Sequence, residues 1–132
     1  MSRWDKLEPH VGQFRAPLAV AYTGVVANLE FGKLIAVSLD ANGRVVIGTA
    51  GASGFKGCVI IHEARPARYP VDVVQLGEVV EFTLSNGNAA AAGTNYTTNA
   101  DGTFGTTAPG AANFKVGFTV EATRLVLRCA VQ

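Results

Sequence analysis

The chain has 132 residues, a formal net charge of +1, 48% hydrophobic residues and 16% charged residues. That length fits one domain that can fold without disulfides or metals. The high hydrophobic share and a charged share below the ~25% typical of soluble domains exclude a disordered tail. With so few charged residues to cover the outside, we expect some apolar surface that meets a partner chain. A charge near zero argues against a general nucleic-acid binder, because phosphate contacts need clustered Lys and Arg, and no apolar stretch reaches the ~20 residues that span a membrane.

The first 28 residues differ from the rest of the chain because no strand or helix period persists through them. Two prolines disfavour a helix there. Trp4 and Phe14 are large side chains on an irregular segment, which suits an arm that lies along another surface. The alternative is an ordinary N-terminal segment folded onto its own domain. We therefore divide the chain into an extended N-terminal arm, residues 1–28, and a single β domain, residues 29–132.

From Gly32 onward, short alternating runs predict one strand after another. The clearest hairpin joins residues 34–39 to residues 44–47 through the turn Asp40–Gly43, where a glycine follows an asparagine as tight turns with positive φ require. Residues 48–57 form a small-residue loop in this interpretation. The strands expected beyond it are residues 58–62, 71–74, 79–84, 95–98, 114–120 and 125–131, with loops at 64–70 and 103–110.

The strand expected at residues 114–120 has the cleanest alternation, which places Phe114, Val116, Phe118 and Val120 on one face. No window of ten or more residues carries a helical apolar stripe. Short strands separated by Gly, Asn and Asp turns indicate an all-β fold, a compact β-barrel or β-sandwich of short antiparallel strands.

Residues that carry catalytic or metal chemistry are few and scattered. His62 stands beside Glu63, a step without metal-ligand spacing, and no cysteine pair has C-x2-C spacing. Residues 51–57 lack the order of a phosphate-binding loop, and no G-x-S-x-G nucleophile elbow is present. We therefore expect no catalytic, cofactor-binding or metal-binding residue, and no enzymatic activity.

The two cysteines, Cys58 and Cys129, both lie in apolar runs. A buried free thiol behaves as a small hydrophobe, which is the interpretation we favour. A disulfide between them depends on a Cα separation that the sequence does not give.

A small basic and aromatic cluster stands in the loop at residues 64–70. It fits an electrostatic contact with a partner or nucleic acid, or a solvated loop tip, of which we favour the second. The candidate partner contacts in the arm and in this cluster are Trp4, Pro9, Phe14, Arg15, Arg65, Arg68 and Tyr69.

Three segments of the C-terminal half follow one another in a recognisable order. Residues 93–103 read GTNYTTNADGT, residues 116–122 read VGFTVEA and residues 125–128 read LVLR. This order resembles the small head-decoration, or capsid cement, proteins of tailed bacteriophages. In that family a G-T-x-Y…D-G strand and turn precede a V-G-x-x-x-E-A strand and a final apolar strand.

Earlier segments extend the resemblance over most of the chain. Residues 32–37 (GKLIAV) and 79–82 (VVEF) look like the β core of the same family, and residues 7–17 (LEPHVGQFRAP) look like the arm of decoration proteins from phages of actinobacteria. The resemblance implies a structural virion protein without enzymatic activity. It would bind the major capsid protein on the outer surface of the assembled capsid, as a homotrimer, after assembly in the host cytoplasm.

Two other functions stay open on the sequence. One is another β-rich virion component, such as a tail-tube or adaptor protein. The other is a carbohydrate-binding module, which needs an exposed aromatic platform, and the candidates for that platform are Tyr69, Tyr96 and Phe104.

Overall fold

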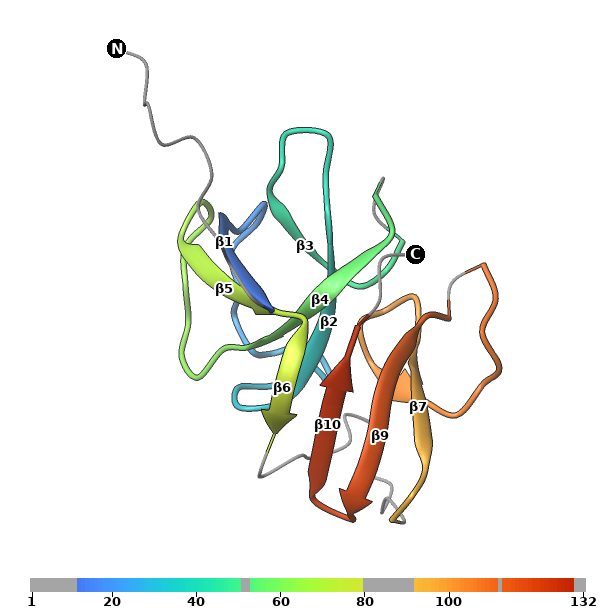
Figure 1. Cartoon of the computed structure of the whole chain (residues 1–132). Coiled ribbons are helices and arrows are strands. Elements are labelled where there is room, and N and C mark those ends of the chain that lie inside the picture. The colour runs from blue at the N-terminus through green and yellow to red at the C-terminus, as the bar shows by residue number, and fades with distance from the viewer. Residues whose placement is uncertain (1–11, 51–52, 80–91, 112, 130–132) are drawn as a thin grey trace, which may run out of the picture.

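The strands expected from the sequence assemble into two antiparallel sheets in the computed structural model, which describes residues 12–50, 53–79, 92–111 and 113–129 (Figure 1). Within those residues the fold is all-β and resembles a sandwich, and neither sheet closes into a barrel, so the expected fold class is confirmed in its sandwich form. The strands are β1 (Gln13–Pro17), β2 (Leu34–Leu39), β3 (Val45–Ile47), β4 (Phe55–Ile60), β5 (Pro70–Val74), β6 (Leu76–Val79), β7 (Asn95–Thr98), β8 (Phe104–Gly105), β9 (Lys115–Glu121) and β10 (Arg124–Arg128).

The first sheet has the order β1-β5-β4-β2-β3, and its strand β2 is buried on both faces. Ile35 and Val37 point into one cluster of apolar side chains, whereas Leu34 and Ala36 point into another. A near-continuous apolar run is what a strand covered on both sides requires.

The second sheet has the order β6-β10-β9-β7-β8 and covers one face of the first. Apolar side chains from both sheets meet between them. This second core cluster contains Leu34, Ala36, Phe55, Cys58, Tyr96, Phe104, Val116, Leu125 and Leu127.

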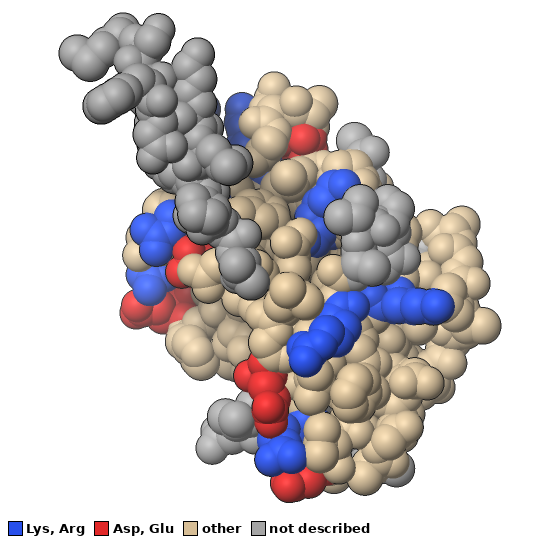
Figure 2. Space-filling view, viewed as in Figure 1, with Lys and Arg blue, Asp and Glu red and all other residues tan. Residues whose placement is uncertain are grey.

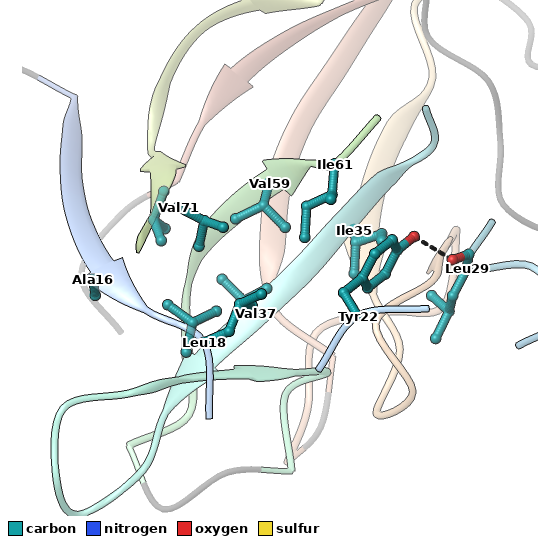
Figure 3. Close-up of a cluster of buried hydrophobic side chains, with 11 residues drawn as sticks. Ala16, Leu18, Tyr22, Leu29, Ile35, Val37, Val59, Ile61 and Val71 are labelled. Carbon is teal, nitrogen blue, oxygen red and sulfur yellow. Dashed lines mark hydrogen bonds between the residues drawn. The ribbon is translucent and has the colours of Figure 1, made fainter. Parts of the chain in front are cut away.

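The other face of the first sheet is covered by the chain between β1 and β2. Leu18, Tyr22 and Leu29 from this stretch pack on the strands, as Figure 3 shows. The Tyr22 hydroxyl donates hydrogen bonds to the carbonyl oxygens of Leu29 and Glu30. The first core cluster therefore comprises Ala16, Leu18, Tyr22, Leu29, Ile35, Val37, Val45, Val59, Ile61, Val71 and Val73.

The described part of the expected arm belongs to the domain. Strand β1 pairs with β5 along its whole length, and Leu18, which follows it, forms a single bridge with Val45 of β3. An edge strand of this kind is held by its backbone pairing and needs no long alternation, which is why the sequence pattern did not mark it. Residues 12–28 are thus folded onto their own domain, which is the alternative to an arm that lies along another surface. Trp4 and Pro9 lie outside the described residues.

In strand β9 the alternating apolar residues do not share one face, contrary to the expectation from the sequence. Phe118 is 41% exposed, whereas its neighbour Thr119 is 1% exposed. Successive residues of β7 pair with Gly117 and Lys115, so Val116 is an extra residue in β9. Such a β-bulge shifts the alternation by one residue, and the second half of the strand turns its apolar side chains outward.

Three smaller differences concern element bounds. Strand β4 begins at Phe55, inside the stretch expected to be a loop, and the two-residue strand β8 lies in the loop expected at 103–110. Of the strand expected at 79–84, Val79 ends β6, and residues 80–84 lie outside the described part of the chain.

One residue, Gln75, joins the two sheets because it alone separates β5 from β6. Its N–H donates to the carbonyl of Gly12 at 2.7 Å, and its side-chain Nε2 donates to the carbonyl of Lys56 at 2.9 Å. Its own carbonyl accepts the N–H of Cys129 at 2.9 Å. The corner between the sheets is therefore tied to the chain before β1, to β4 and to the end of β10.

Candidate partner-binding surface

A hollow of about 350 Å³ brings together three of the residues expected to contact a partner. Arg15 of β1 lines it together with Arg65 and Tyr69 of the loop between β4 and β5, and Ile60 and Asp72 form part of its wall. Arg15 and Asp72 are register partners on the outward face of β1 and β5. Sequence patterns do not predict this arrangement, because Arg15 and Arg65 lie about fifty positions apart and come together through the pairing of β1 with β5 and the backbone hydrogen bonds next to it.

The cations of this hollow are matched by nearby carboxylates. The Arg15 Nε donates to Asp72 Oδ1 at 2.9 Å, and this bond, with the charge of Asp72, raises the pKa of Arg15. The Arg65 Nη2 lies 2.7 Å from Glu63 Oε1, and its guanidinium lies 4.3 Å from the centre of the Tyr69 ring. A phosphate site needs unmatched positive charge, so this hollow fits a partner with a mixed or neutral surface better than nucleic acid.

The other expected contact residues are placed differently. Phe14 is half-buried and packs against the first core cluster. Arg68 is exposed in a left-handed conformation with φ of 70°, and its N–H donates to the Leu18 carbonyl at 2.8 Å. Arg68 therefore stands on the same loop as Arg65 and Tyr69 but does not line the hollow.

Residues 19–31 carry apolar side chains that the sequence interpretation did not single out. We name the exposed side chains of Val20, Val25, Val26 and Phe31 the 19–31 patch; Val25 is 81% exposed. The Phe31 ring lies 5.6 Å from the ring of Tyr22, which is buried, so the patch stands on a packed base. The signal that could have found it is an apolar stretch that lacks any strand or helix period.

The segment that carries the 19–31 patch is hydrogen-bonded to the loop that lines the hollow. Tyr22 forms a bridge with Arg65, in which each N–H donates to the carbonyl of the other at 2.9 and 3.0 Å. Segment 19–31 and the loop that holds Arg65 and Tyr69 are thus fixed to each other.

The outward face of the second sheet carries a further set of exposed apolar side chains. Leu76, Phe118 and Val120 stand there as a result of the bulge in β9 and the pairing of β6 with β10. Figure 2 shows basic side chains over the upper ends of β9 and β10, and both acidic and basic side chains towards their other ends. At these other ends, Arg124 Nε lies 2.8 Å from Glu78 Oε1 and Arg124 Nη1 lies 3.7 Å from Glu121 Oε1.

The aromatic platform of a carbohydrate-binding module is not assembled. Tyr96 and Phe104 are buried in the second core cluster, and Tyr69 alone of the three reaches the surface. Among the residues that the structure describes, no three His, Cys, Asp or Glu side chains gather as metal ligands. No helix in that part of the chain is long and apolar enough to cross a membrane.

In sequence, the chain matches no family model and no curated protein. In structure, it is similar to a chain from Mycobacterium phage Patience, with a TM-score of 0.75 and 20% sequence identity. The likeness covers 98% of this chain and 96% of that chain. At this identity it shows a common fold along nearly the whole length of both chains.

Proposed function

We propose that this chain is a structural protein of a phage virion that binds the outer surface of the assembled capsid and stabilises it. The observation that carries the proposal is the 19–31 patch, apolar side chains held out to solvent on a packed base. Exposed apolar clusters of this kind are typical of surfaces that meet another protein. The similarity to a chain from a phage supports the virion setting.

The physical role needs contact area and no reacting groups. A protein that binds the assembled shell, and not its free subunits, stabilises that shell by linkage. The near-neutral hollow beside the 19–31 patch suits this role, because Arg15 and Arg65 are already paired and set the position of a partner more than the affinity for it. Copies that contact each other on one shell, as in the expected homotrimer, bind more tightly than single copies.

Co-sedimentation with expanded capsids that lack the protein tests the proposal. We expect the full chain to pellet with expanded capsids, to raise the temperature at which they break, and to stay in solution with unexpanded shells. Failure to bind expanded capsids overturns the proposal. If the purified chain forms rings or tubes in negative stain and does not bind shells, it is a tail component. Mass photometry of the same sample tests whether the chain forms a homotrimer.

A matched pair of variants locates the binding surface. Val25→Asp places a charge in the 19–31 patch and should weaken capsid binding by about tenfold or more, equivalent to about 1.4 kcal/mol. Val120→Asp makes the same change on the outward face of the second sheet and should leave binding unchanged. Equal losses in both variants, with both chains folded by circular dichroism, contradict the assignment to the 19–31 patch.

A further inference from the structure

The two cysteines, 71 positions apart in the sequence, meet where the two sheets join. Cys58 of β4 is the register partner of Val74 at the end of β5. The N–H of Cys129, just past β10, donates to the carbonyl of Gln75, the residue that follows Val74. Cys58 belongs to the second core cluster and Cys129 packs against it, so both side chains are held in one place by strands of different sheets.

The two side chains lie in the same core cluster but differ in their surroundings, and the Cys129 thiol donates to the carbonyl oxygen of Val116 at 3.8 Å. Cys58 is fully buried, and burial, with the hydrogen bond to Cys129, raises its pKa well above the ordinary value. Cys129 is half-buried, and the hydrogen bond from Cys58 lowers its pKa. Cys129 is therefore the more accessible sulfur and the one that forms a thiolate more readily, which are the two properties of an attacking cysteine.

We propose that Cys58 and Cys129 form a modification site that a small-molecule disulfide oxidises to a cross-link between the two sheets. The Cys129 thiolate attacks one sulfur of the oxidant, whose S–S bond breaks and releases one small thiol. Cys58 then gives up its proton and attacks the Cys129 sulfur, which displaces the second small thiol. Two protein thiols are oxidised by two electrons in all, and the oxidant leaves as two thiols that carry the protons.

The cross-link has a defined structural effect. It closes a loop from residue 58 to residue 129, which contains β5 to β10, and joins β4 of the first sheet to the end of β10 in the second. Closing a loop of this length restricts the unfolded chain, which for a domain of this size raises the melting temperature by roughly 10 °C.

Oxidation of the purified full chain tests the proposal. The reduced protein is incubated with oxidised glutathione, and the remaining thiols are blocked with an alkylating agent. We expect a monomer without free thiols, a mass lower by two hydrogens, faster migration on a non-reducing gel, and a melting temperature roughly 10 °C higher that a reductant reverses. The proposal is overturned if both thiols stay free, or if the oxidised product is a dimer linked between chains.

Two variants separate the steps. Cys129→Ser lacks the attacking sulfur and should show neither the cross-link nor the rise in melting temperature. Cys58→Ala lacks the second sulfur and should stop at the first step, with glutathione attached to Cys129. A rise in melting temperature in Cys129→Ser equal to that of the unmodified sequence contradicts the proposal, and this readout does not depend on how well Cys58→Ala folds.

Discussion

Gly117 lies directly after the bulge in β9, where the backbone of β10 passes so closely that a methyl group has no room. In Gly117→Ala the added Cβ would overlap the carbonyl oxygen of Val126 and lie 3.0 Å from its carbonyl carbon. It would also lie 3.3 Å from the Cα of Leu127. These neighbours are backbone atoms, so no side-chain rotation relieves the contact and β9 and β10 must move apart.

The expected magnitude follows from what that movement disrupts. Overpacking a filled interior costs about 1–3 kcal/mol, and each ladder hydrogen bond lost between β9 and β10 costs about 1 kcal/mol more. The smaller freedom of alanine in the unfolded chain opposes this by about 0.4–1 kcal/mol. We therefore expect Gly117→Ala to lower the free energy of unfolding by about 3 kcal/mol.

Two other glycines provide matched controls for the same substitution. Gly110 has no heavy atom within 4 Å of the added Cβ and no positive φ, so Gly110→Ala should be neutral or stabilising by up to about 1 kcal/mol. Gly43 also faces open space but has φ of +75°, so Gly43→Ala should cost about 1 kcal/mol from backbone conformation alone.

Urea denaturation followed by circular dichroism measures all three variants on one scale. The expected order of stability is Gly110→Ala, then Gly43→Ala, then Gly117→Ala. If Gly117→Ala unfolds within about 1 kcal/mol of Gly110→Ala, the close approach of β9 and β10 described above is refuted.

The remaining predictions use the same unfolding measurement. Leu125→Ala should lower the free energy of unfolding by about 3 kcal/mol because its side chain is fully buried between the sheets, whereas Val126→Ala, on the outward face, should cost less than about 1 kcal/mol. Tyr22→Phe removes a hydroxyl that donates to two backbone carbonyls and should cost about 1–2 kcal/mol. Burial raises the pKa of Tyr22 above 10.0, so the contribution of its hydroxyl to the free energy of unfolding is complete below that pH and is lost as the pH rises through the folded-state pKa. If the Tyr22→Phe chain loses as much stability at alkaline pH as the unmodified chain, this expectation is contradicted. Arg68→Gly should raise stability by about 1 kcal/mol because glycine adopts the left-handed conformation of that position without strain, and a loss of stability speaks against the turn as described.

Local chemistry explains what the sequence predicted well. The turn Asp40–Gly43 forms as expected: the Asp40 carboxylate accepts the N–H groups of Asn42 and Arg44 at 2.9 Å each, and Gly43 has φ of 75°. Every interaction of this turn lies within five residues, so a short window of sequence contains all of it.

The features that the sequence did not predict depend on distant partners. The bulge at Val116 exists only in register with β7, so the alternation of β9 considered alone places Phe118 on the wrong face. The hollow that joins Arg15 to Arg65 likewise needs β1 beside β5, a pairing between segments far apart in the chain. Sequence patterns therefore predicted most of the strands that support the candidate site, but they did not predict how the residues of the site are arranged.

The corner at Gln75 has a consequence for how the molecule comes apart. One residue holds hydrogen bonds to Gly12, to Lys56 and to Cys129, and its neighbours on either side belong to different sheets. The two sheets also share the second core cluster, so detaching one of them would expose apolar side chains of the other. The described part of the chain should therefore open in a single all-or-none transition, and a pull on either sheet is transmitted to the other instead of peeling one away.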